Sequence, residues 1–134
     1  MRKNTIPALI ALIALLPFTA NSIGSISTTP GEIDQDFMTD VEDTSINLSD
    51  NVAQHFAEPA VNNAKELIDA FTQVEQFYVA RSDAEDAVEL ARKSRELSQK
   101  IIQQVDSKDF DSASASATAL SRACKECHNF YKKS

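Results

Sequence analysis

Residues 110–131 read FDSASASATALSRACKECHNFY, and their apolar side chains recur every three or four positions, the spacing of a helix that buries one face. The members of this stripe are Phe110, Ala113, Ala117, Leu120, Cys124, Cys127 and Tyr131. Both cysteines of the chain lie on the stripe, so we expect them to face a hydrophobic core. The stretch therefore predicts a long C-terminal helix that packs against other helices.

Three further stretches have the same spacing and are separated by helix breakers. The first runs from a capping box at residues 29–32 to Pro59, the second from Pro59 to Tyr78, and the third from a capping box at residues 82–85 to Val105. Four amphipathic helices with short connections predict an all-α fold, an antiparallel up-down-up-down four-helix bundle over residues 31–134.

The C-terminal helix carries the motif Cys124-Lys125-Glu126-Cys127-His128. C-x-x-C-H is the attachment signature of a c-type haem, in which two thiols bond to the porphyrin vinyl groups and the adjacent imidazole binds the iron. The three residues occupy positions i, i+3 and i+4, so one helix face presents all of them. The motif predicts one covalently bound haem c on the C-terminal helix, held by Cys124 and Cys127, with His128 as an axial iron ligand.

Other uses of these residues fit less well. A redox-active dithiol favours a βαβ pattern, which the sequence lacks. A structural zinc site needs about four ligands, and the chain has only His55 as a further histidine or cysteine. A disulfide would account for the cysteines but not for His128. The alternative without haem is a helical interaction module that uses Cys124 and Cys127 as a dithiol.

The N-terminal segment has the layout of a secretory signal peptide. Arg2 and Lys3 precede an apolar run over residues 6–18, and small and polar residues follow. The run is shorter than the ~20 residues that span a bilayer, and an uncleaved anchor is the alternative. We expect a signal peptide over residues 1–22, a flexible segment over 23–30, and a periplasmic protein without stable membrane insertion.

The chain is acidic, with a formal net charge of −7. Loss of the basic residues of the signal peptide makes the mature chain more negative still. An acidic surface disfavours binding to nucleic acid and favours a redox partner protein with a basic docking patch. No nucleophile or acid–base pair stands out elsewhere in the sequence, so we do not expect an enzyme.

Two side chains compete to be a second axial ligand. Met38 lies on the core-facing stripe of the first helix, at the end of the bundle where the haem motif is expected. His55 lies about 25 Å further along that helix, at ~1.5 Å per residue, and is expected to be a surface or capping residue. Met38 is therefore the predicted ligand, and its alternative role is simple core packing. The expected pocket wall comprises Phe37, Met38, Val41, Val74, Phe77, Tyr78, Ala84, Ala87 and Val88.

Taken together, the signal peptide, the four helices and C-x-x-C-H near the C-terminus resemble the cytochrome c-prime group, the class II c-type cytochromes. Residues 124–132, CKECHNFYK, are similar to the ending C-x-x-C-H-x-x-[FY]-[RK] of the group. The resemblance implies that Lys132 lies near the proximal imidazole. It also allows a homodimer, because members of the group commonly dimerise through their first two helices.

The group has a five-coordinate, high-spin branch and a low-spin branch with a methionine ligand from the first helix. Met38 favours the low-spin branch. The resemblance then implies a periplasmic monohaem c-type cytochrome that transfers electrons. The alternative is a five-coordinate haem protein that binds small gases such as NO or CO.

Overall fold

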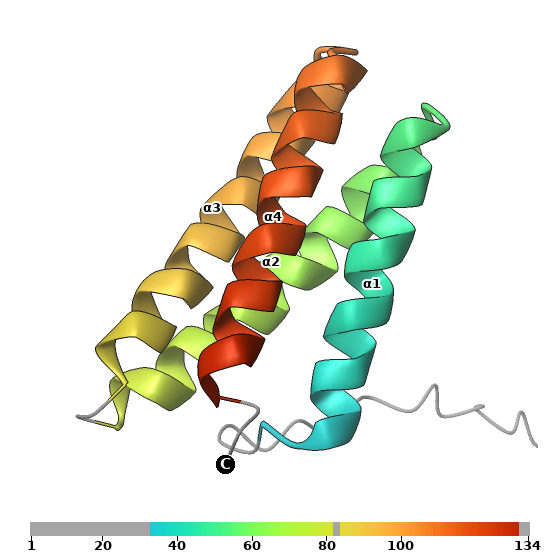
Figure 1. Cartoon of the computed structure of the whole chain (residues 1–134). Helices are drawn as coiled ribbons and strands as arrows, with labels where there is room; N and C mark the ends of the chain where they lie inside the picture. The colour runs from blue at the N-terminus through green and yellow to red at the C-terminus, as the bar shows by residue number, and fades with distance from the viewer. Residues whose placement is uncertain (1–32, 82–83, 132–134) are drawn as a thin grey trace, which may run out of the picture.

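The computed structural model describes residues 33–81 and 84–131 (Figure 1). This part of the chain contains no strand and forms four α-helices: α1 Gln35–Ala53, α2 Ala57–Val79, α3 Glu85–Asp106 and α4 Phe110–Tyr131. The prediction of an all-α four-helix bundle is confirmed. The predicted signal peptide, the segment 23–30 and Lys132 lie outside the described residues.

The four helices surround one core. α1 packs against α2 and α4, and α3 packs against the same two helices. The last turns of α4 and the first turns of α1 lie at the same end of the bundle, together with the last turn of α2 and the first turn of α3 (Figure 1). Segments far apart in the sequence therefore meet at this end. In the described part of the chain, no helix combines the length and the apolar character needed to cross a membrane.

One large aliphatic side chain from each helix forms the centre of the core. Leu48, Leu67, Ile101 and Leu120 are all fully buried. Burial of each stabilises the fold by about 1.5–3 kcal/mol relative to an exposed side chain. Buried alanines of α2 and α4 pack into the same core cluster and let the helices approach closely: Ala60, Ala64, Ala113 and Ala117.

The start of α1 differs from the prediction. Asp34 has an extended backbone, and its Oδ1 accepts a 2.8 Å hydrogen bond from the Phe37 amide. The carboxylate thus satisfies an amide of the first turn that has no partner within the helix. The helix begins at Gln35, and the predicted capping box at residues 29–32 lies outside the described residues.

The start of α3 also differs from the prediction. Ala84 precedes the helix, and its carbonyl accepts the first intrahelical hydrogen bonds, from the amides of Ala87 at 3.1 Å and Val88 at 3.2 Å. The helix therefore begins at Glu85 and not at the predicted cap Ser82, which lies outside the described residues. Consequently, Glu85 is the first residue of α3 and not the last residue of a capping box that begins at Ser82.

α1 and α3 end in the same way, with a residue in the left-handed region. His55 has φ 59° and Lys108 has φ 61°. After α1, the Phe56 amide donates to the Asn51 carbonyl and the His55 amide to the Val52 carbonyl, at 2.8 and 3.1 Å. This pair of bonds defines a Schellman motif, whose left-handed position is usually a glycine. The histidine and the lysine hold these positions at a conformational cost.

Candidate functional site

A cavity of about 280 Å³ lies between all four helices. This volume is close to the lower end of the usual range for pockets that hold small molecules and cofactors. Apolar side chains dominate the wall, among them Val41 of α1, Phe71 and Val74 of α2, and Leu90 of α3. The cavity is therefore suited to a largely apolar group that reaches solvent at one edge.

Four residues predicted from the sequence line this cavity together. Cys124, Cys127 and His128 reach it from the last turns of α4, and Met38 reaches it from the first turns of α1. All four side chains are half-buried, and neither cysteine forms a disulfide. The cavity thus combines two free thiols, an imidazole and a thioether, which is a soft donor set for a transition metal or its complex.

The polar part of the wall was not predicted. Ser45 of α1 and Ser94 of α3 are buried, at 8% and 2% exposure, and both line the cavity. Ser45 also forms a hydrogen bond with Cys124. One feature of the sequence could have indicated the buried position of Ser45. This serine occupies a core-facing position in the apolar stripe of the first helix. A buried hydroxyl needs a hydrogen-bond partner, so a serine at such a position indicates a polar neighbour.

The environment of the thiols keeps them protonated. Burial raises the pKa of Cys124 to about 11, and the nearby Cys127 adds to this effect by charge repulsion. Burial also raises the pKa of Cys127. Reactive dithiols instead have a lowered pKa, because the thiolate is the nucleophile. The arrangement therefore does not resemble a dithiol redox centre.

The cavity lies about one helical turn further into the bundle than predicted. α3 contributes Leu90, Ala91 and Ser94 to its wall, in place of Ala84, Ala87 and Val88. α2 contributes Phe71 and Val74, but neither Phe77 nor Tyr78 is among the described residues that line it. The reason is that α4 continues to Tyr131, so the level of Cys124 faces an inner turn of each neighbouring helix.

Phe37 and Tyr78 therefore occupy other places than the predicted pocket wall. Phe37 is half-buried and packs against the core cluster. It precedes Met38 on α1, and one residue is a rotation of about 100° around a helix, so the ring and the thioether point in different directions. Tyr78 makes an edge-to-face contact with Phe77, with 5.1 Å between ring centroids.

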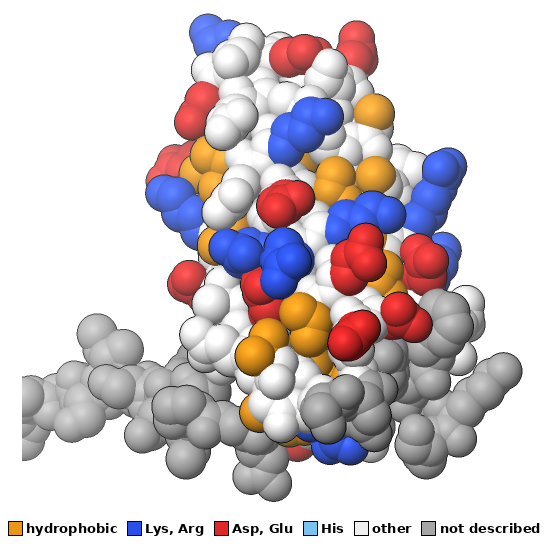
Figure 2. Space-filling model, turned by 90° about the vertical axis from the view of Figure 1, so that its left-hand side faces the viewer, with side chains coloured by type: hydrophobic (Ala, Val, Ile, Leu, Met, Phe, Trp, Pro, Cys, Tyr) orange, Lys and Arg blue, Asp and Glu red, His pale blue; other side chains and the backbone are white. Residues whose placement is uncertain are grey.

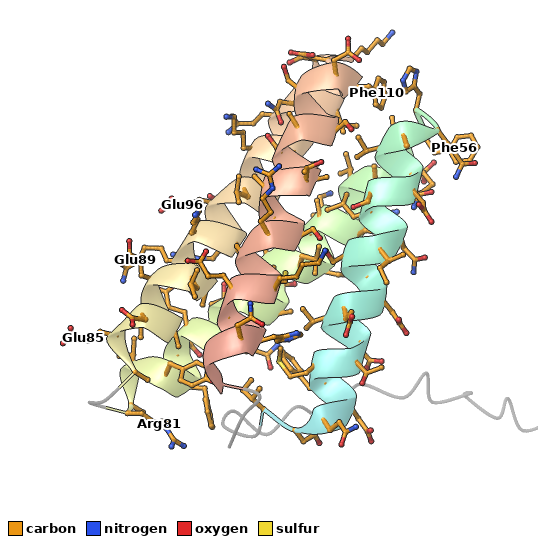
Figure 3. All side chains as sticks on the ribbon, in the orientation of Figure 1. Phe56, Arg81, Glu85, Glu89, Glu96 and Phe110 are labelled. Atoms are coloured by element: carbon orange, nitrogen blue, oxygen red, sulfur yellow. The ribbon has the colours of Figure 1, made fainter. Side chains whose placement is uncertain are left out.

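His55 lies at the opposite end of the bundle, as predicted. Its exposed ring stacks on Phe110, with 4.4 Å between centroids and an interplanar angle of 16°. Figure 3 shows Phe110 and Phe56 at this end, with Arg81 at the other. His55 is therefore remote from the cavity, and Met38 is the nearer of the two predicted candidates for a second ligand.

The cavity opens between α1 and α4. Its exposed lining residues are Glu42 and Ile46 on α1 and Lys125 on α4. The remaining lining residues are buried or half-buried. A bound group would therefore reach the surface between these two helices.

Within the part of the chain that the structure describes, no group of three or more His, Cys, Asp or Glu side chains is arranged to hold a bare metal ion. The zinc alternative accordingly has no set of ligands there. Comparison of the chain with protein-family models, curated proteins and solved structures gave no match. The functional interpretation thus depends on the residues of the cavity itself.

Proposed function

We propose that the protein is a periplasmic monohaem c-type cytochrome that transfers electrons. In this proposal Cys124 and Cys127 hold one haem covalently, His128 is an axial ligand of the iron, and Met38 is the second. The observation that carries it is that Met38 and the C-x-x-C-H residues line one apolar cavity although they belong to opposite ends of the chain. This convergence supports the helix order expected for the cytochrome c-prime group, with the four helices running alternately up and down.

The residues of the cavity fit the group that the motif calls for. The thiols are free and adjacent on one face of α4, the wall is mainly apolar, and the cavity opens between α1 and α4, where the carboxylates of the ring would reach solvent. When bound, haem iron supplies one-electron redox chemistry. The chain orients the iron through His128 and Met38 and excludes water with the buried residues of α2 and α3. Such a site transfers electrons to a partner protein and needs no catalytic residue.

The haem is tested by expressing the full chain in cells with an intact haem-attachment apparatus. After a denaturing gel, staining for haem peroxidase activity should show a band at the size of the chain, because the thioether bonds survive denaturation. The double variant Cys124→Ala/Cys127→Ala should give an unstained band. His55→Ala is the control and should stain like the wild type, since His55 lies at the other end of the bundle. A colourless wild-type band would overturn the proposal.

A further inference from the structure

The outer surface of α1 carries negative charge only. Its charged residues are Asp36, Asp40, Glu42, Asp43 and Asp50, all of them exposed, and the helix has no Lys, Arg or His. α3 differs, because its exposed face mixes both signs: Glu85, Glu89, Arg92, Lys93, Glu96 and Lys100. Figure 2 shows this mixture of red and blue side chains on the side of the molecule that α3 occupies. α1 therefore has the most negative net charge of these helices, −5, compared with −3 for α2 and −1 for α3, because its carboxylates are not balanced by basic side chains.

An exposed isoleucine lies within this acidic surface. Ile46 is 54% exposed and lines the mouth of the cavity. On the surface of a helix, its neighbours are the residues three and four positions away. Three of these are Glu42, Asp43 and Asp50, which are exposed and acidic. An apolar centre with a charged rim is the usual composition of a protein–protein contact surface.

We propose that Glu42, Asp43, Ile46 and Asp50, here named the acidic α1 face, dock a redox partner protein whose contact surface is basic around an apolar centre. The inference rests on the proposed function, because it is the haem edge at the cavity mouth that the docked partner would approach. The α4 side of the mouth carries the exposed Lys125, so it is the α1 side, with Glu42, Asp43 and Asp50, that steers a basic partner and raises the rate of encounter. The exposed apolar side chain of Ile46 is then removed from water on docking, which stabilises the complex.

A second copy of the chain is a poorer occupant of this surface. In a symmetric dimer the same patch contacts itself, so Glu42, Asp43 and Asp50 of one copy would face the same carboxylates of the other. Like charges brought together at an interface cost several kcal/mol. The acidic α1 face therefore favours a partner of opposite charge over self-association.

The docking is tested by electron exchange between the full haem-loaded protein and a lysine-rich c-type cytochrome. The reduced protein is mixed with the oxidised probe in a stopped-flow instrument at low ionic strength, and the second-order rate constant is measured. The variant Asp43→Lys/Asp50→Lys should lower this constant roughly tenfold, because it removes local steering. The difference should largely disappear near 1 M salt, where the screening length falls to about 3 Å.

Glu89→Lys/Glu96→Lys is the matched control, since it makes the same change in net charge on α3. It should slow the exchange much less than the α1 variant. An equal effect of the two variants would mean that only the net charge of the protein matters. That result would overturn the proposed docking surface but leave the proposed haem protein intact. An unstained protein in the haem assay would instead overturn the proposed function, and the inference with it.

The apolar part of the surface is tested by Ile46→Ser. This variant should slow the exchange even at high salt, whereas Val79→Ser on α2, which changes a side chain that is 63% exposed, should not. If Ile46→Ser leaves the rate of exchange unchanged, the isoleucine is not part of the docking surface and the proposal is refuted. A wild-type dimer that Ile46→Ser converts to a monomer, seen by analytical ultracentrifugation, would assign the surface to a second copy and contradict it.

Discussion

Met38 is half-buried and lines the cavity from α1, while His128 lines it from α4. If the thioether binds the iron, the centre is six-coordinate and low-spin, and its reduction potential is raised. Met38→Ala should then convert the optical spectrum from low-spin to high-spin, and the reduced variant should bind carbon monoxide rapidly. The measurement is an absorption spectrum of the reduced protein before and after addition of carbon monoxide.

Val41→Ala is the control for this prediction, because Val41 also lines the cavity from α1 but has no ligating atom. It should keep the low-spin spectrum. A wild-type protein that is already high-spin and takes up carbon monoxide at once would contradict Met38 ligation. That result would favour the gas-binding alternative on the same fold.

Lys108 is exposed and occupies the left-handed position after α3, with φ 61°. A residue with a Cβ atom in this conformation costs roughly 1–2 kcal/mol, and glycine avoids this cost but has greater freedom in the unfolded chain. Lys108→Gly should therefore raise the free energy of unfolding by about 0.5–1 kcal/mol. Urea unfolding followed by circular dichroism measures it.

Lys100→Gly is the opposite control for that substitution. Lys100 is also exposed, but it lies within α3, where glycine costs about 1 kcal/mol relative to a good helix former. The two substitutions should shift the urea midpoint in opposite directions. A loss of stability in both would show that the backbone at residue 108 does not need the left-handed conformation.

Among the elements, α4 carries the motif, and Asp109 stabilises its start. The Ser112 amide donates a 3.1 Å hydrogen bond to Asp109 Oδ1. This interaction with Ser112 lowers the pKa of Asp109 below its ordinary value of 3.8. A lowered pKa in the folded state means that the carboxylate stabilises the fold above pH 3.8, and that this contribution is lost as the pH falls through the lowered value.

Asp109→Ala should therefore lower the melting temperature at neutral pH and have little effect in strong acid. Asp109→Asn separates the cap from the charge, because asparagine is also a good N-cap but does not titrate. It should retain more of the stability at neutral pH than alanine. Thermal melts of the three proteins at neutral and at strongly acidic pH test this. An effect of Asp109→Ala that is independent of pH would exclude a contribution from the charge.

The sequence predicted which face of each helix is buried better than it predicted which turns of neighbouring helices lie at the same level along the bundle. Spacing along each helix shows which side chains face the core, and it placed Cys124, Cys127 and Met38 on core-facing stripes. Periodicity does not show which turn of one helix meets which turn of another. That depends on how far each helix extends past its neighbours, and α4 extends about two turns beyond Cys124, to Tyr131. The turn that faces Cys124 was therefore misplaced, and Ser94 was missed.

Two helix ends were beyond prediction for a related reason. The left-handed residues that end α1 and α3 are His55 and Lys108, whereas glycine is the usual marker of such an end. The sequence located the breaks approximately, through Pro59 and the polar residues 106–109, but not the backbone conformations that form them. The identities of His55 and Lys108 do not predict a left-handed conformation, because the packing of the flanking helices sets it.

For the whole molecule, the cavity implies that folding depends on its contents. The cavity opens to solvent, so without haem its apolar wall is in contact with water, and burial of about 100 Å² of this wall by a haem would add about 2.5 kcal/mol of stability. The total stability of a domain is only about 5–15 kcal/mol. The wild-type chain made without haem attachment should therefore melt well below the haem-loaded protein, by more than about 10 °C, since 1 kcal/mol shifts the melting temperature of such a domain by about 4–8 °C.

Ser94→Leu provides a sharper test, because it places an apolar side chain in the cavity from α3. In the haem-free chain it should raise the melting temperature by covering part of the apolar wall. In cells that attach haem it should reduce the stained fraction, because the leucine and the ring compete for one volume. These opposite effects distinguish a cavity that a cofactor fills from a simple packing defect, in which Ser94→Leu would stabilise the protein in both preparations. Equal melting temperatures for the haem-free and haem-loaded wild type would refute the coupling of folding to the cofactor.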